Sequence, residues 1–356
     1  MALHKIKNTT ARWNAFSKVD LLGYIDFWSL TISLESLNPK ETQGITVQNL
    51  STVDETPLSF VEYERLKKVL TLAAHEYTHF VDASSSLWGL RHLSYINACS
   101  MLNKGDETQF YILKNSYEYM RSIRLPDYYT TVDAKIPMGR PWGSFVTSGI
   151  MFSSEGKVTD RPIIFVNFCT VDGKRFVRSP LSTVSLLEAS AMAKEIEVRA
   201  NLIKRLSNDE RIVEERRFND ELLSYIYNPK ITEYSACFHL LANLQNEKDV
   251  GVVSQCAGVL VRLVLNAPEI AFNTAAKNIK VYADANNLDA SHLAVQRIKM
   301  ALNYKNRGAL FFLIVSLLPK KILDSEIDFY MGIEEALKKI GLSLEKLRRA
   351  AFVEAK

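Results

Sequence analysis

The chain is 356 residues long, enough for a large core and for either two domains or one elaborated domain. Hydrophobic residues make up 47% of it and charged residues 24%, as is typical of a folded soluble protein. The net charge of +4 is too weak to indicate a nucleic-acid or membrane partner, so neither is expected.

The cysteines and the apolar runs indicate the compartment. The four cysteines are scattered and form no C-x-x-C pair, which predicts reduced thiols rather than a disulfide framework. Residues 1–16 have no apolar signal core, and the most apolar run, 309–318, is about half as long as a membrane span. The sequence therefore predicts a cytoplasmic protein with a buried helix at 309–318.

The first predicted elements are strands followed by a helix. Residues 24–34 are rich in aromatic and β-branched side chains, and 44–47 form a second, shorter candidate strand. Residues 59–62 have the capping-box form S-x-x-E, so a helix is predicted to start at Ser59. Its apolar residues recur at helical spacing and predict a buried stripe, made of Leu66, Leu70, Ala73, Tyr77 and Phe80.

The middle of the chain changes from helical to β character. Two helices are predicted at 87–103 and 107–122. Residues 126–180 are rich in proline, glycine and β-formers, and 144–152 is a candidate strand. Asp172-Gly173 is a strong turn signal, which predicts a hairpin between strands 163–171 and 174–178.

After residue 182 the sequence is charge-rich, with apolar periodicity and almost no strand signal. Helices are predicted at 185–207, 209–227, 229–246, 251–265, 288–303, 308–318 and 331–352. We therefore expect an α+β fold in two parts. Residues 1–181 would hold a small mixed sheet and the helix that starts at Ser59, and residues 182–356 would form a mostly helical half.

The helix that starts at Ser59 contains an H-E-x-x-H pentad at residues 75–79. Because residues four apart lie on one helix face, His75 and His79 can bind the same metal ion. Glu76 lies about 100° round the helix, where it can reach a water on the metal without being a ligand. This pattern indicates hydrolysis in which Zn²⁺ lowers the pKa of the water toward about 7 and Glu76 is the general base. The alternative is a helix whose two histidines merely pack or face solvent.

Residues 73–82, AAHEYTHFVD, resemble the active-site helix of the zincin metallopeptidases. The metzincin subgroup has a Gly three residues after the second His and a His or Asp three further on, whereas this chain has Asp82 and Ser85 there. The gluzincin subgroup, whose third ligand is a Glu on a later helix, is the better match. The resemblance implies one zinc ion per chain, a zincin-like first half and a protein or peptide substrate.

Zinc needs a third protein ligand, and Glu188 is the favoured candidate. It is followed by the small residues 189–191, which would let two helices approach closely, as in the glutamate helices of gluzincins. An equally weighted alternative is a capping box at 185–188, in which Glu188 caps its own helix. Glu233, in a similar E-x-S-A pattern, is the runner-up ligand. The other four histidines are isolated in the sequence. An isolated histidine more often has its hydrogen bonds satisfied within the protein, or faces solvent, than binds a metal.

Three further residues are candidates for supporting roles. Asp82 lies one turn beyond His79, where zincins often have a carboxylate that accepts the second imidazole N–H. The alternative is a solvent-facing Asp82. A side chain that stabilises the transition state should also exist, and Tyr234 and His239 are the candidates.

The sequence thus predicts a zinc metallopeptidase that cuts within extended segments. The G-x-M-E-N motif of one large aminopeptidase family is absent, and the helical half would restrict access. Substrate would add as a strand beside 24–34 or 144–152. One alternative is a catalytically idle zincin fold that serves as a binding or regulatory module, with a partner on the helical half. Another is a metal-independent helical scaffold that carries the pentad by chance.

Overall fold

A computed structural model describes residues 23–27, 29–45, 56–102, 107–133 and 139–356. Over these ranges the protein is mixed α+β, with small sheets and a helical C-terminal half, as predicted. In the candidate strand 44–47, Gly44 lies in a turn and Ile45 has no regular secondary structure, and residues 46 and 47 lie outside the described ranges.

The elements before residue 182 are β1 (Tyr24–Asp26), β2 (Thr31–Ser33), α2 (Pro39–Thr42), α3 (Phe60–Ser85), α4 (Leu87–Ser100), α5 (Thr108–Ile123), η2 (Asp127–Tyr129), β3 (Thr131–Val132), β4 (Gly143–Phe152), β5 (Val158–Cys169) and β6 (Arg175–Pro180). Those after it are α6 (Thr183–Lys204), α7 (Asn208–Ile226), α8 (Thr232–Gln245), α9 (Val250–Leu265), α10 (Glu269–Lys277), α11 (Lys280–Ala285), α12 (Leu293–Asn303), α13 (Arg307–Leu317), α14 (Glu326–Lys339) and α15 (Leu344–Glu354).

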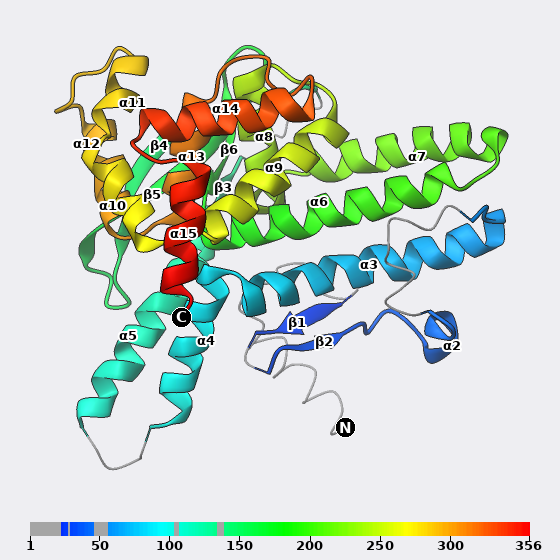
Figure 1. Cartoon of the computed structure of the whole chain (residues 1–356), viewed down its shortest axis with the longest axis horizontal. Coiled ribbons are helices and arrows are strands. Elements are labelled where there is room, and N and C mark those ends of the chain that lie inside the picture. The colour runs from blue at the N-terminus through cyan, green and yellow to red at the C-terminus, as the bar shows by residue number, and fades with distance from the viewer. Residues whose placement is uncertain (1–22, 28, 46–55, 103–106, 134–138) are drawn as a thin grey trace.

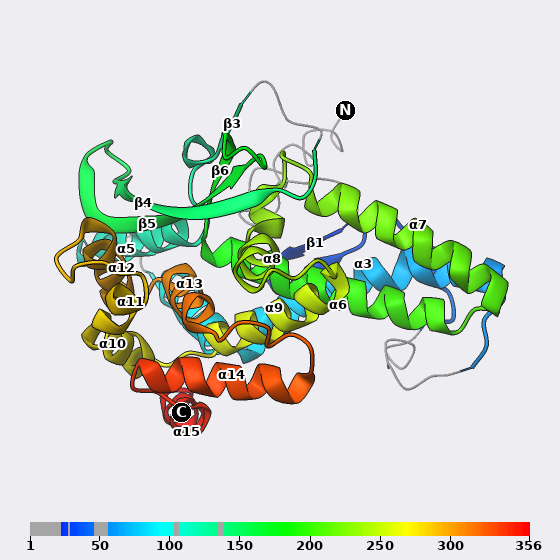
Figure 2. The same ribbon diagram turned by 90° about the horizontal axis from the view of Figure 1, so that it is seen from above.

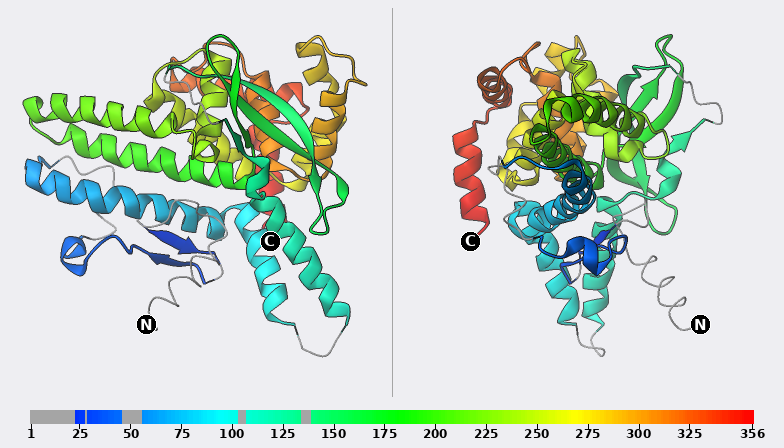
Figure 3. Two further views of the ribbon diagram at one scale, coloured as in Figure 1. Left: turned by 180° about the vertical axis from the view of Figure 1, so that it is seen from behind. Right: turned by 90° about the vertical axis from the view of Figure 1, so that its right-hand side faces the viewer.

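Three long helices define the half of the molecule that contains the H-E-x-x-H pentad. Helix α6 lies between α3 and α7, and the β1–β2 hairpin lies beside α3 (Figure 1). Helices α4 and α5 form an arm that projects from the body (Figure 3). The larger sheet covers one side of α8 and α13, whereas α14 and α15 lie on the other side (Figure 2).

Helix α3 begins as the sequence predicts. The Ser59 hydroxyl accepts a hydrogen bond from the Glu62 backbone N–H at 3.3 Å, so Ser59 is the N-cap. The helix ends at Ser85, and Ser86 caps α4 directly afterwards. A Cβ on Gly89 would lie 2.2 Å from the Ala83 carbonyl oxygen, so only glycine permits this tight corner.

The predicted mixed sheet is wrong, because every pairing among the described strands is antiparallel. The larger sheet has the order β3-β6-β5-β4, and short turns join β4 to β5 and β5 to β6, which only antiparallel neighbours allow. The predicted strand at 144–152 and the hairpin turn are confirmed as β4 and as the β5–β6 connection. Gly173 has a φ of 81° in that turn.

The predicted single strand 24–34 is instead a hairpin of β1 and β2. Asp26 pairs with Thr31 next to the turn, and Leu30 has a φ of 54°, which reverses the chain direction. Aromatic and β-branched content predicts extended backbone but does not mark a turn without glycine or proline, which is why the sequence missed this one.

Most of the predicted C-terminal helices are confirmed, with two corrections. The predicted helix 331–352 is two helices, α14 and α15, because Gly341 has a φ of 80° and ends the first. Residues 288–292 are not helical, and α10 and α11 were not predicted, since helices of nine and six residues show too little periodicity.

The apolar helices are buried inside the protein. In α13 the residues from Gly308 to Val315 are all buried, as expected of the most apolar run. Within the described ranges no single helix is long and apolar enough to cross a membrane. Helices α9 and α10 together pass that test by length and composition, but they meet at an angle of 101°.

Helix α6 is the central packing element, because it contacts α3, α8 and α9. Small side chains permit this: a Cβ on Gly258 of α9 would lie 2.9 Å from the Cβ of Ala193 in α6. The largest buried apolar cluster includes residues from both sides of residue 181, such as Phe168 and Leu186.

A buried histidine lies in an aromatic cluster near the larger sheet. The His239 ring stacks on Trp142 at 5.5 Å between centroids and meets Phe168 and Tyr227 edge-on, each at 5.0 Å. Its Nε2–H donates to the Ile226 carbonyl oxygen at 3.1 Å. Burial lowers the pKa of His239 to about 4, so the imidazole is neutral at pH 7.

We predict that this histidine makes the protein less stable in acid. Between about pH 6.5 and about pH 4 the unfolded chain binds a proton that native His239 does not, so stability falls as the pH falls. The loss attributable to His239 should reach about 3 kcal/mol in urea unfolding experiments across this range. His239→Phe should reduce the slope, and His292→Gln at an exposed helix cap should not. An identical pH dependence in wild type and His239→Phe would contradict the prediction.

Candidate metal centre

Two helices bring the three residues proposed as ligands together. His75 and His79 lie one turn apart on α3, and Glu188 lies on α6 opposite them. One donor atom from each of the three residues lies within 4.8 Å of the other two. Glu188 Oε2 is 3.4 Å from His75 Nε2 and 3.6 Å from His79 Nε2. The side chains of His79 and Glu188 are almost fully buried.

Glu188 does not cap its own helix. The cap of α6 is Ser182, whose hydroxyl accepts from the Ser185 backbone N–H at 3.2 Å, while the Ser185 hydroxyl accepts from the Ser182 N–H. The alternative of a capping box at 185–188 is therefore wrong, because the N-cap is Ser182 and the helix already begins at Thr183. Glu188 is left in the second turn, facing α3.

The two separations from the carboxylate to the imidazoles are those of a possible zinc site. Ligand atoms about 2.0–2.1 Å from Zn²⁺ in tetrahedral geometry are about 3.3–3.4 Å apart, close to the two separations from Glu188 Oε2 to the imidazoles. Glu188 Oε2 is also buried without a hydrogen-bond partner, which is costly for a carboxylate unless a cation compensates it. Two imidazoles and one carboxylate form a donor set typical of catalytic zinc sites.

The charges of the cluster favour a cation. Burial alone would lower the pKa of His75, but the adjacent Glu188 and Glu195 carboxylates hold it well above its usual value. Burial likewise raises the pKa of Glu188, and the neighbouring imidazoles more than reverse this, to about 2. Without a metal, a proton on the imidazole thus balances the buried carboxylate. A metal ion would take over that balance and release the proton.

Glu195 is a residue that the sequence reasoning missed. Its Oε2 lies 3.2 Å from His75 Nδ1, so Glu195 accepts the Nδ1–H and turns Nε2 toward Glu188. Glu195 lies seven residues after Glu188, two turns along the same face of α6. Once Glu188 had been chosen as a ligand, this spacing of seven residues would have indicated that Glu195 lies on the same helix face.

Asp82 does not make the predicted hydrogen bond. It is buried, so the solvent-facing alternative is wrong. Its Oδ2 and His79 Nδ1 both lack a hydrogen-bond partner among the described residues. Burial raises the pKa of Asp82, and the Ser190 hydroxyl opposes this rise most, followed by the charges of His79 and Arg262. The carboxyl thus lies close enough to influence His79 electrostatically without fixing its tautomer by a hydrogen bond.

The other predicted residues divide between the cluster and the rest of the fold. Glu233 is buried on α8 and accepts a hydrogen bond from the Ser182 hydroxyl at 3.1 Å, so the structure does not bring it to the histidines. His239 lies in the aromatic cluster at the sheet, because α8 turns that face away from α3. Tyr234 does line the cavity beside the histidines.

A cavity of about 540 Å³ opens onto the cluster. One wall is β1, and the others come from α3, α6, α7 and α8. Glu76 is buried and lines this cavity, and burial raises its pKa while His75 and His79 oppose the rise. Tyr225 of α7 lines it too, and its pKa is raised by burial and by Glu188 and Glu195. Tyr225 could not be predicted from the sequence, because α7 contains no recognisable motif.

No known protein family, characterised protein or solved structure matches this chain. Because function resides in sites rather than in folds, it is inferred here from the side chains of this cavity.

We predict that zinc binding depends on Glu188 and not on the similar Glu233. Glu188→Gln removes the one anionic group among the three ligand residues and should lower zinc affinity by roughly tenfold or more, as should His75→Ala, which removes an imidazole. Glu233→Gln is the matched control and should leave zinc affinity unchanged. Glu233 is also a buried glutamate in an E-x-S-A sequence, but it lies on α8. Chelator competition on folded variants measures both. Equal zinc affinity in wild type and Glu188→Gln would refute the assignment.

Proposed function

We propose that this protein is a zinc-dependent metallopeptidase whose zinc is held by His75, His79 and Glu188. The observation that carries the proposal is the convergence of the H-E-x-x-H histidines with one buried carboxylate at tetrahedral ligand separations. Zinc bound there would polarise a substrate carbonyl and make water a stronger nucleophile. Proton transfer and stabilisation of the transition state are assigned to other side chains that line the same cavity.

Glu76 is the proposed general base. Glu76 lines the cavity beside the histidines and is not one of the three ligand residues. Its carboxylate can therefore accept a proton instead of binding the metal. It takes a proton from the attacking water as the oxygen adds to the peptide carbon. It then gives that proton to the leaving nitrogen as the C–N bond breaks. The products are a free carboxylate and a free amine.

A tyrosine hydroxyl is the proposed donor to the oxygen that becomes negative during attack. Tyr225 and Tyr234 both line the cavity, with ring centroids 6.4 Å apart. Tyr225 is the favoured candidate, because it lines the cavity together with Glu188 and Glu195, and burial and these two carboxylates raise its pKa. A phenol held protonated beside the metal ligands can donate throughout the reaction.

Substrate would bind along the β1–β2 hairpin. Residues 23–25 and Phe27 line the cavity, and β1 is paired on one side only among the described strands. A peptide could therefore add beside β1 through its backbone. The other predicted edge, β4, does not line this cavity, because its sheet packs against α8 and α12. Backbone pairing beside a cavity walled by helices favours cleavage within extended segments.

The decisive experiment separates zinc binding from proton transfer. Glu76→Gln removes the base but no ligand, so the variant should keep its zinc and lose about 10²–10⁴ in kcat on an unfolded protein substrate. Glu64→Gln is the control, since Glu64 lies on the same helix and lines the same cavity. Zinc content is measured by atomic absorption and new termini by mass spectrometry. Full activity in Glu76→Gln would contradict the mechanism, and zinc binding without any hydrolysis in wild type would favour an idle binding module.

Tyr225→Phe should lower kcat by roughly 10²-fold with little change in KM, because the hydroxyl acts only as charge develops. Tyr227→Phe is the matched control, as Tyr227 lies two residues away in the aromatic cluster and does not line the cavity. Steady-state kinetics on one quenched peptide gives both constants. An unchanged kcat in Tyr225→Phe, with a loss in Tyr234→Phe, would transfer the role to Tyr234.

A further inference from the structure

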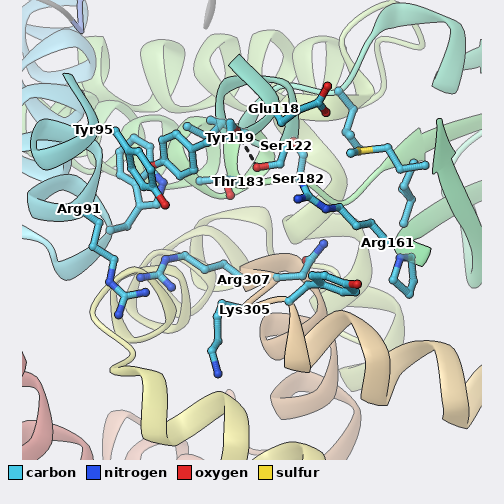
Figure 4. Close-up of a pocket in the computed structure, with 18 of the residues that line it drawn as sticks. Arg91, Tyr95, Glu118, Tyr119, Ser122, Arg161, Ser182, Thr183, Lys305 and Arg307 are labelled. Carbon is cyan, nitrogen blue, oxygen red and sulfur yellow. Dashed lines mark hydrogen bonds between the residues drawn. The ribbon is translucent and has the colours of Figure 1, made fainter. Parts of the chain in front are cut away.

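A second cavity, of about 690 Å³, lies at the N-terminal end of α6. Its walls come from α4, α5, the β5 strand and the starts of α6 and α13. None of its lining residues lines the cavity at the histidine cluster. Figure 4 shows basic side chains from several elements around this space, among them Arg91, Arg161, Lys305 and Arg307.

Arg307 is a buried cation without a counter-charge in contact. It is only 5% exposed, its Nε has no hydrogen-bond partner, and no ion pair to it forms among the described residues. Its guanidinium lies 5.4 Å from the centre of the Phe272 ring. Burial lowers its pKa to about 10, which still leaves it charged at pH 7. Burying an unpaired charge is costly, so an anion in the cavity would stabilise this arrangement.

Two helix N-termini open onto the same space. Helix α6 starts at Thr183 and α13 at Arg307, and both ends line the cavity. A Cβ on Gly308 would lie 2.0 Å from the Leu181 carbonyl oxygen, so glycine is what allows the two ends to meet. The first turns of helices carry backbone N–H groups without intrahelical partners and the positive end of the helix dipole. One N–H at each end is already capped, that of Ser185 by the Ser182 hydroxyl and that of Ala309 by the Asn306 amide oxygen. The other N–H groups of such ends can bind anions.

The lining carries a surplus of positive charge. Five basic residues face two acidic ones, a balance of +3, the basic set being Arg91, Lys114, Arg161, Lys305 and Arg307 and the acidic set Glu118 and Glu269. Both acidic residues are already engaged, Glu269 with Arg91 at 2.9 Å and Glu118 with Arg121 at 3.7 Å. Two of the basic residues also pair with carboxylates outside the lining, Arg91 with Glu354 at 2.7 Å and Lys114 with Glu155 at 3.7 Å, so the surplus rests on Arg161, Lys305 and Arg307. The Arg161 guanidinium lies over the Tyr304 ring rather than against a carboxylate.

We propose that this cavity binds a small phosphorylated molecule, whose phosphate is held by Arg307 and the N-termini of α6 and α13. A phosphate offers three acceptor oxygens and about two negative charges, which suits a guanidinium beside two helix N-termini better than a single carboxylate does. The volume is that of a small-molecule site. The indole N–H of Trp88, buried in the wall without a hydrogen-bond partner, offers a further donor.

Titration calorimetry with inorganic phosphate and with pyrophosphate, at constant ionic strength, tests the proposal. Wild type should bind at least one of the two at a single saturable site, whereas added chloride should give no such signal. Arg307→Met should weaken binding by about tenfold or more, because it removes a charged donor. Arg178→Met is the matched control, since Arg178 also stacks on a ring, at 4.6 Å, and has a partnerless Nε, but lies outside the cavity.

Arg161→Met provides a second variant at a less buried position, should Arg307→Met fail to fold. It too should weaken phosphate binding several-fold, through lost charge. His75→Ala should bind phosphate like wild type, which separates this site from the metal centre. Absence of saturable binding of either probe, or equal binding by Arg307→Met and wild type, would overturn the proposal.

Discussion

The structure depends on one buried carboxylate. Glu188 lies in a helix whose neighbouring residues, from Ser185 to Ala191, are all buried, and its charge is therefore far from bulk water. A carboxylate in such a place is tolerated only when a cation compensates it. His75 and His79 are the groups that face it, so α3 and α6 must lie at close range with this register. The small side chains at 189–191 allow that approach.

Both cavities are built on the same helix. The N-terminus of α6 forms part of the phosphate cavity, and Glu188 lies five residues further, about 8 Å along the axis. A row of rings also connects the cavities through the core, with Phe27 6.1 Å from His79 and 6.3 Å from Trp88 between centroids. A substitution that displaces α6 should consequently disturb both sites. A substitution of a side chain that lines only one cavity should leave the other site unchanged.

Local pattern was enough to predict the elements that local forces determine. The Ser59 cap, the pentad and the Asp172-Gly173 turn each depend on residues within one turn of each other, and the structure contains the predicted helix start and hairpin. The sequence favoured Glu188 because small residues beside a carboxylate permit a close helix contact, and in the structure Glu188 lies beside His75 and His79. Glu195 and Tyr225 were missed because their roles arise only when α6 and α7 pack beside α3. Likewise Glu233 and His239 were candidates by residue type, but each packs against elements other than α3. The sequence around a residue does not show which distant element it will face.

Two buried charges in the described part of the chain, Glu188 and Arg307, have opposite signs, and each lines a cavity. Glu188 Oε2 has no hydrogen-bond partner and depends on protonated imidazole for compensation, while Arg307 has no carboxylate in contact. If neither charge had a function, apolar side chains of similar volume at positions 188 and 307 would give a protein that is at least as stable. The two charges lie at separate cavities, each large enough to admit a ligand. A cation at Glu188 and an anion at Arg307 would neutralise both, and this complementarity is the physical reason to treat each cavity as a binding site.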